Sequence, residues 1–309
     1  KLDDAEQLAY ADAVYASFKH GDLDAADVLA ALKPLTSSKT REVATAPLTS
    51  FNWIYRNLAQ TDAQRAKLAA WAKAAYLPRM QQLGYHRKAN EADTDSLLRS
   101  TLADELALTV KLPEVRAELL KQGDAALKRK ADGHLDLMAA DSDLLGAALG
   151  VAVQERGKPA VDALIAEVPQ TSDPAFRNAM LAGLSEVNDP TLANQVRDFA
   201  LDKKVKVGEM SMLLRGGRDT RKSRDESWQW TTTNYDKIVD RTGSFSGGRL
   251  PELVGGGGCS QDEADRLQAF FKDRAKQVSG AERGLAQATE STVLCHSLVQ
   301  KQDAAAILR

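Results

Sequence analysis

The 309-residue sequence has few of the residues that usually carry catalysis or metal binding. It contains two cysteines and four histidines, and aromatic residues make up only 6%. None of His20, His86, His134 and His296 belongs to an H-E-x-x-H segment, in which two histidines one helical turn apart bind zinc and the glutamate acts as the base. The chain also lacks G-x-S-x-G, and no G-K-[ST] follows its glycine run. These absences exclude the usual sequence signatures of zinc peptidases, α/β-hydrolases and P-loop proteins.

Neither charge nor hydrophobicity points to a nucleic-acid or membrane partner. The 41 Lys and Arg residues nearly balance the 43 Asp and Glu residues, which gives a net charge of −2. No apolar run approaches the ~20 residues that a membrane helix needs. We therefore expect no nucleic-acid partner and no membrane insertion. The sequence begins at Lys1, inside a helical pattern and without a signal-peptide profile, which we interpret as the start of a fragment or a processed product.

The two cysteines, Cys259 and Cys295, allow at most one internal disulfide. Cys259 precedes one predicted helix and Cys295 lies within the next, so antiparallel packing of these helices can bring the thiols together. The alternative is a pair of free, buried thiols. A disulfide would favour a periplasmic or secreted location over a cytoplasmic one, because disulfides persist in oxidising compartments.

What the sequence does have is helical periodicity along almost its whole length. In the middle third, helices are predicted to open at Asp141, at Lys158, at Asp173-Pro174 and at Asp189-Pro190, where an Asp can cap the helix and a Pro suits its first turn. Such closely spaced starts predict short helices stacked in pairs.

Other residues that start or break helices support the same interpretation. Ser260 and Ser279 each open an S-x-x-E capping box, and Thr61 with Gln64 resembles another. Pro47 and Pro78 are expected to kink or split their helices. No alternating β pattern is sustained over several segments.

Together these patterns predict an all-α fold. Roughly a dozen or more short helices with short turns fit a HEAT- or armadillo-like α-solenoid better than a bundle, and the lack of a strict period makes the repeats degenerate. We predict one repeat domain over residues 1–309, with a sub-boundary near residues 85–95.

The least generic stretch is 223–240, SRDESWQWTTTNYDKIVD. Trp228, Tyr235 and Ile238 would fall close to one face of a single helix, with Arg224 at its entrance. A basic, glycine-containing connection precedes this stretch. It is followed by Gly247-Gly248-Arg249-Leu250, by the glycine run 255–258, which we interpret as a mobile surface loop, and by a helix ending in Phe270-Phe271.

This order resembles the last third of the C-terminal helical domain of zinc aminopeptidases of the aminopeptidase N type. Segments elsewhere agree: Leu83-Gly84-Tyr85, then Glu91, Asp95 and Leu97-Leu98-Arg99, resemble the family's LGW…E…D…LR segment, with Tyr in place of the usual Trp. The similarity is collinear from about Ala9 to the end. The residues that carry it are Gly84, Tyr85, Arg99, Arg224, Trp228, Trp230, Asn234, Tyr235 and Arg249.

The resemblance implies a parent enzyme that releases N-terminal amino acids from peptides with a catalytic zinc. The family's G-x-M-E-N segment, which binds the amino terminus of the substrate, is missing here, as is H-E-x-x-H. We therefore expect the zinc module upstream of this chain and expect the chain alone to be inactive. Its partners would be the catalytic domain of the same polypeptide and peptide substrates, for which this part would wall and close the chamber.

The basic cluster Arg215, Arg218, Arg221, Lys222 and Arg224 has three interpretations. It can be a solvated loop whose cations meet nearby acids, because most charge runs are solvated. Nucleic acid is a weaker alternative, given the interleaved acids. The third is a substrate-facing role for Arg224, Arg218 and Arg221, because a guanidinium suits a carboxylate and the resemblance implies an inner face that contacts the distal end of a peptide.

A competing functional class is a stand-alone α-solenoid scaffold that binds protein segments in its groove. Such a scaffold would have its own start codon and polar capping helices near Lys1, whereas a fragment would begin in mid-protein.

Overall fold

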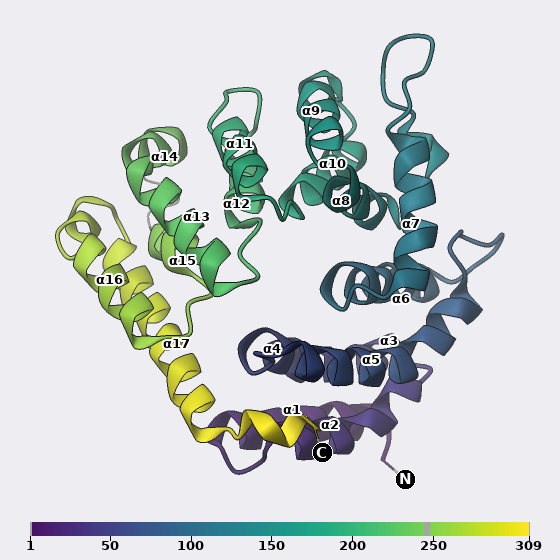
Figure 1. The fold of residues 1–309 in the computed structure, drawn as a ribbon, viewed down its shortest axis with the longest axis vertical. Helices are drawn as coiled ribbons and strands as arrows, with labels where there is room; N and C mark the ends of the chain where they lie inside the picture. Colours follow the sequence, from purple (N-terminus) through teal and green to yellow (C-terminus); the bar gives the residue numbers. More distant parts are fainter. Residues whose placement is uncertain (1, 244–247, 309) are drawn as a thin grey trace.

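The computed structural model describes residues 2–243 and 248–308, which include neither Gly247 nor Lys1. Within them the protein is built from α-helices and short 3₁₀ or π turns, and its only extended pairing is an isolated bridge between Arg129 and Leu135. The helices follow one another around a curved, nearly closed ring (Figure 1). The predicted all-α solenoid is confirmed.

The first part of the chain forms the lower and right-hand sides of the ring in Figure 1. Asp24 caps α2, and Thr61 with Gln64 forms the expected capping box of α5. Pro47 splits its predicted helix into α3 and α4, whereas Pro78 lies inside a continuous α5. The elements are α1 (Asp4–His20), α2 (Ala25–Leu32), η1 (Lys33–Ser37), α3 (Arg41–Thr45), α4 (Pro47–Asn57), α5 (Asp62–Leu83), α6 (Asp93–Ala103), the π-helical turn η2 (Asp104–Thr109) and α7 (Pro113–Ala126).

The middle part forms the top of the ring. Asp173 and Asp189 cap their helices as predicted, each followed by Pro at the first helical position. The start expected at Asp141 is wrong by four residues, because the Asp141 carboxylate accepts hydrogen bonds from the Arg87 and Asp143 N–H groups in a turn. The elements are η3 (Leu137–Ala139), α8 (Leu145–Arg156), α9 (Lys158–Glu167), η4 (Val168–Gln170), α10 (Pro174–Ser185), α11 (Pro190–Ala200) and α12 (Val207–Arg215).

The last part forms the left-hand side. Its elements are α13 (Arg221–Thr233), α14 (Tyr235–Thr242), α15 (Leu250–Gly255), α16 (Gln261–Phe271), η6 (Arg274–Gln277), α17 (Ala281–Lys301) and η7 (Ala304–Leu308). Ser260 caps α16 as predicted, but Ser279 caps nothing. Gly280, in the left-handed region with φ 79°, precedes α17 instead, because the turn before this helix needs a positive φ.

From α8 onward the helices form two layers, as expected for a solenoid. In one layer α8 packs on α10, α10 on α12, α12 on α15 and α15 on α17; in the other α9 packs on α11 and α11 on α13. Some crossings are close: a Cβ added to Gly123 of α7 would lie 2.4 Å from the Ala148 carbonyl oxygen of α8. The stacking curves the chain and leaves α12, α15 and α17 on the inner side.

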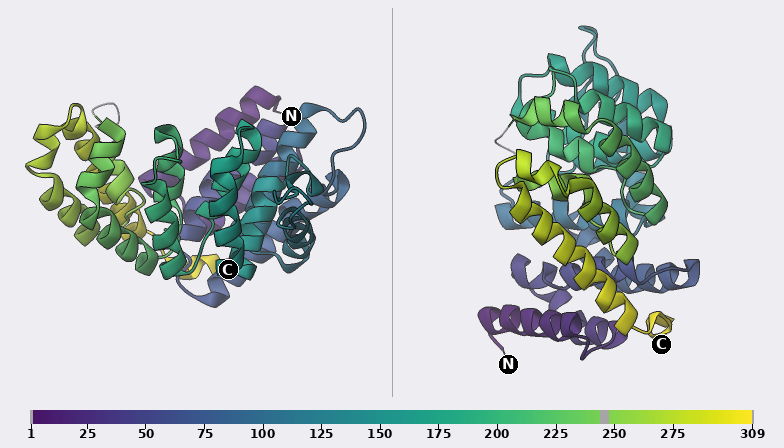
Figure 2. Two further views of the ribbon diagram at one scale, coloured as in Figure 1. Left: turned by 90° about the horizontal axis from the view of Figure 1, so that it is seen from above. Right: turned by 90° about the vertical axis from the view of Figure 1, so that its left-hand side faces the viewer.

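The two ends of the chain meet and close the ring. In Figure 2 the long α17 runs down to the N-terminal helices, where η7 contacts α2 and α5. Lys301 Nζ donates to the His20 carbonyl at 3.1 Å, and Gln64 Nε2 donates to the Ala304 carbonyl at 2.7 Å. Leu298 and Ile307 are buried in the N-terminal hydrophobic cluster.

The buried side chains form two hydrophobic clusters. The first runs from α1 into α8, and the second runs from the end of α7 to α17. Leu83 and Leu98, on either side of residues 85–95, both belong to the first cluster. The division of the chain into domains stays a prediction.

Candidate binding cavity

The ring encloses a cavity of about 990 Å³ on its inner side. Both ends of the chain contribute walls to it. The walls come from α1 and α4, from the C-terminal end of α10, from α12 and the loop after it, and from α13, α15 and α17. The side chains that line it include Lys19, Asn52, Arg56, Glu186, Arg215, Arg218, Asp219, Arg224, Glu252 and Gln287.

The loop after α12 directs Arg218 into this cavity. A Cβ added to Gly216 would lie 2.6 Å from the Ser185 carbonyl oxygen, so the loop presses directly on the end of α10. Gly217 follows with φ 67°, a conformation that other residues rarely adopt. Only glycines fit this close approach and turn, and together they set the direction of the backbone at Arg218.

One nitrogen of the Arg218 guanidinium has a hydrogen-bond partner, and another has none. Its Nε donates to the hydroxyl of the buried Ser227 at 2.7 Å, while its Nη2 is shielded from solvent and has no hydrogen-bond partner. Burial, together with the charges of Arg197 and Arg215, lowers the pKa of Arg218 to about 9. The guanidinium therefore sits in a positive, poorly solvated environment.

Arg224 also lines the cavity, but it is committed to Glu263. Arg224 Nε donates to Glu263 Oε1 at 2.9 Å, and the same carboxylate accepts from the Cys259 N–H at 2.9 Å and the Ser260 hydroxyl at 2.8 Å. Burial alone would raise the pKa of Glu263, but these hydrogen bonds and the Arg224 charge lower it. Glu263 stays ionised as the centre of a buried network.

Arg221 does not line the cavity. Its guanidinium donates to Asp225 Oδ2 at 3.2 Å, to Ser260 Oγ at 2.8 Å and to Asp262 Oδ2 at 2.9 Å, all outside the cavity lining. Of the three arginines predicted to face substrate, the structure places Arg218 and Arg224 at the cavity and leaves only Arg218 without an acidic partner among the described residues. Whether either contacts substrate stays a prediction.

Two buried or half-buried acidic residues that the sequence did not single out are Glu186, which lines the cavity, and Glu105, which does not. Glu105 accepts from Asn52 Nδ2 at 2.8 Å, and its other oxygen has no partner. Burial raises the pKa of Glu105 and of Glu186 to about 7. No local motif marks these residues, because the ring brings them together from α4, η2 and the end of α10.

The stretch expected to form one helix forms two. Asn234 separates α13 from α14: its N–H and its Nδ2 both donate to the Trp230 carbonyl, at 3.0 and 2.9 Å. Because the helix stops there, Trp228 and Tyr235 do not share a continuous helical face. Both rings nevertheless pack on Phe270, with ring centroids 5.7 and 5.3 Å from it.

The remaining residues of the family-like pattern have structural contacts. Trp230 is buried and donates through Nε1 to Asp198 at 3.0 Å, while Arg249 is exposed just before α15. Gly84 ends α5 with φ 77°. The next residue, Tyr85, is partly buried, and its carbonyl accepts from Gln122 Nε2 at 2.9 Å.

Arg99 is the centre of a buried network. Its side chain is 0% exposed and pairs with Glu91 and, at 3.3 Å, with Asp143. It also donates from Nε to the Gly84 carbonyl at 3.1 Å. Arg99 therefore ties the end of α5 to α6 and to the segment before α8.

Cys259 and Cys295 form a disulfide, with their Cα atoms 5.0 Å apart. The bond joins the loop before α16 to the middle of α17, and Cys295 lines the cavity. The glycine run 255–258, next to the disulfide, is not a free surface loop. Gly255 ends α15 against Leu267, and residues 256–258 line the cavity.

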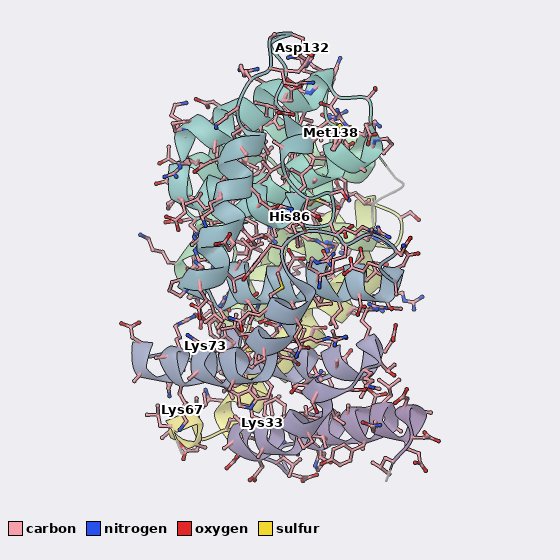
Figure 3. All side chains as sticks on the ribbon, turned by 90° about the vertical axis from the view of Figure 1, so that its right-hand side faces the viewer. Lys33, Lys67, Lys73, His86, Asp132 and Met138 are labelled. Carbon is pink, nitrogen blue, oxygen red and sulfur yellow. A yellow bond between two sulfur atoms is a disulfide. The ribbon has the colours of Figure 1, made fainter. Side chains whose placement is uncertain are left out.

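The residues described here do not fit the zinc that the resemblance implies for the parent enzyme. Across 2–243 and 248–308, no group of three or more His, Cys, Asp or Glu side chains is arranged to hold a metal ion. His134 bonds to Glu167 and His20 to Asp22, and the exposed His86 lies on the outer side of the ring (Figure 3). Among the helices of these residues, none is both long and apolar enough to cross a membrane.

Comparison with known proteins connects this geometry to a family. The profile of the ERAP1-like C-terminal domain matches residues 1–293. The chain belongs to this family. The ERAP1-like domain is similar to Aminopeptidase M1 of Arabidopsis thaliana, at 26% identity over 200 residues, and to Aminopeptidase M1-A of Oryza sativa subsp. japonica, at 26% over 203 residues.

These matches cover 63% and 64% of the ERAP1-like domain but only 22% of each relative. The chain thus spans about a fifth of the length of the curated relatives it matches. The predicted resemblance to an aminopeptidase C-terminal domain is confirmed.

Proposed function

We propose that this domain walls and closes the substrate chamber of a zinc aminopeptidase that releases N-terminal amino acids from peptides. The catalytic zinc and its ligands would belong to another part of the polypeptide. Two relatives named as aminopeptidases and the family match support the reaction class.

The observation that carries the chamber role is the cavity itself. It holds about 990 Å³, is walled by both ends of the chain and is lined by polar and charged side chains from α1, α4, α12 and α17. A concave solenoid face exposes many helices around one space and so suits an extended peptide. Closing such a chamber over an active site would exclude bulk water and admit peptides rather than folded proteins.

We further propose that the parent protein works in the periplasm or outside the cell. The Cys259–Cys295 disulfide supports this, because such bonds persist in oxidising compartments. A free-thiol titration of the protein taken from its own cells, with and without reductant, tests the compartment: two reactive thiols in the unreduced protein would contradict it.

The reaction class is tested by comparing the 309-residue chain with the intact enzyme that contains it. We expect the chain alone to leave leucine 4-nitroanilide intact, and the intact enzyme to hydrolyse it until a zinc chelator is added. Chelator-sensitive hydrolysis by the pure chain would contradict the assignment of the zinc ligands to another module. An intact protein that hydrolyses no aminoacyl substrate would contradict the reaction class.

A further inference from the structure

Glu105 is a buried carboxyl group without a cationic partner. It lies in η2, the π-helical turn that continues α6 and packs against α5, α7 and α8, and the residue is 5% exposed. Such π turns often occur at functional sites. Among the described residues, no Lys, Arg or His nitrogen lies within 4.0 Å of its carboxyl oxygens. An ionised carboxylate at this position is a buried, unpaired charge, which is costly.

The hydrogen bonds of Glu105 indicate that a donor is missing. Asn52 Nδ2 of α4 donates to Glu105 Oε2 at 2.8 Å. The other oxygen of each group, Glu105 Oε1 and Asn52 Oδ1, is shielded from solvent and has no hydrogen-bond partner. Both atoms are acceptors when Glu105 is ionised, and most buried polar atoms in proteins are paired. A proton on Oε1 turns one of the two acceptors into a donor.

The balance of burial and charge around Glu105 favours the protonated acid. Burial raises its pKa to about 7, and the charge of Asp104, its exposed neighbour in η2, acts in the same direction. The Asn52 hydrogen bond and the charge of Arg56 from α4 oppose this shift and are outweighed. The carboxyl group therefore gains and loses its proton near neutral pH.

The elements packed on η2 do not neutralise Glu105. From α5, Tyr76 lies near it: burial mainly, and the Glu105 charge to a lesser degree, raise the pKa of Tyr76, so this hydroxyl stays neutral. Arg116 of α7 pairs with Glu155 of α8. Arg99 of α6 belongs to the buried network described above. Each nearby cation of these elements thus has its own acidic partner.

We propose that a proton on Glu105 Oε1, donated to Asn52 Oδ1, holds α4 against η2, and that loss of this proton releases α4. The protonated acid and the amide form two hydrogen bonds, one in each direction. Ionisation leaves Asn52 Oδ1 without a donor beside a charged group, so α4 separates from η2 and water reaches the carboxylate. This pair is a pH-sensitive latch, closed at low pH and opening as the pH rises through about 7.

The latch acts on the cavity wall. Asn52, Trp53 and Arg56 of α4 all line the cavity, whereas Glu105 lies behind them in η2. Release of α4 therefore changes the shape of the cavity without a ligand. The proposal goes beyond the chamber function and does not rest on it.

Infrared spectroscopy of the 309-residue chain tests for the proton. The C=O stretching band of protonated carboxyl groups is followed from pH 4.5 to pH 9, and the difference from Glu105→Gln gives the part that belongs to Glu105. Glu186→Gln is the matched control, because burial also raises the pKa of Glu186 to about 7, whereas Asn52 bonds to Glu105. We expect the Glu105 band to disappear with a midpoint near pH 7 and to be retained in Glu186→Gln.

Hydrogen exchange of the α4 amides tests the latch. The unchanged chain and Glu105→Gln are compared at the same pH, because a glutamine amide makes the hydrogen bonds of the protonated acid at every pH. At pH 4.5 we expect α4 to exchange equally fast in both. At pH 8 it should exchange about 10- to 100-fold faster in the unchanged chain and in Glu186→Gln than in Glu105→Gln. Asn52→Ala, which removes the partner, should exchange fast at both pH values.

Three results overturn the proposal. These are a Glu105 band that is absent at pH 4.5, a Glu105 band that persists at pH 9, and equal exchange of α4 in the unchanged chain and Glu105→Gln at pH 8. Each leaves the chamber role intact, because that role is tested by hydrolysis in the intact enzyme.

Discussion

The disulfide between Cys259 and Cys295 joins the loop before α16 to the middle of α17. Its removal should greatly lower the stability of the protein. The two cysteines are 36 residues apart. In the chain-entropy description, closing a loop of that length lowers the entropy of the unfolded chain and so adds about 4 kcal/mol to the free energy of unfolding. The stability lost when a disulfide is removed is typically about 2–4 kcal/mol. We expect the Cys259→Ala/Cys295→Ala double variant to lose about that much stability.

Urea unfolding followed by circular dichroism measures this loss. If the free energy of unfolding falls by ~3 kcal/mol for each molar increase in urea, the urea concentration at the unfolding midpoint should fall by about 1 M. The unchanged protein with reductant should match the double variant, and reductant should not affect the variant itself. If the double variant and the oxidised protein unfold at the same urea concentration, the bond does not constrain the fold and the reasoning is refuted.

Two further predictions concern buried charges. Arg99→Ala leaves Glu91 and Asp143 without their cation and should lower the free energy of unfolding by about 3–5 kcal/mol, with part restored by Arg99→Lys; a loss below about 1 kcal/mol in urea unfolding would contradict the network. Burial raises the pKa of Glu105 from 4.5 to about 7, so ionising Glu105 in the folded protein lowers the stability. The full stability is therefore present at low pH and is lost as the pH rises through 7. Glu105→Gln should therefore stabilise the protein at pH 8 by up to about 3 kcal/mol, keep the Asn52 contact and have little effect at pH 4.5; melting curves showing the same shift at both pH values would count against this.

Much of the fold could be predicted because local chemistry marks it. Asp173 and Asp189 cap helices in the structure as their position before Pro predicts, and Ser260 does the same for α16. Local signals failed where a competing contact was stronger. Ser279 gave way to Gly280, whose left-handed backbone forms the turn, and the helix stops at Asn234, whose φ of −103° and ψ of 14° are not helical and whose Nδ2 donates to the Trp230 carbonyl.

The candidate site was harder to predict because its residues meet only through the ring. Loop composition identified the arginines but could not show that Glu263, nearly forty positions later, holds Arg224 and leaves Arg218 open. Nor could it show that Glu186 of the cavity wall lies close enough to Asp104 of η2 for that charge to raise its pKa. Such pairings depend on the curvature of the whole solenoid, which a degenerate repeat does not encode in a fixed period.

The chamber role is tested most directly by filling the cavity in the intact enzyme. Gln287 of α17 lines it, whereas Glu290, one turn away, is exposed and outside the lining. With Gln287→Trp, we predict that kcat/KM for a nonapeptide falls about tenfold or more, equivalent to ~1.4 kcal/mol, while hydrolysis of leucine 4-nitroanilide is unchanged. Glu290→Trp should change neither. If Gln287→Trp leaves the nonapeptide unaffected, or slows both substrates equally, the domain does not wall the path of the peptide.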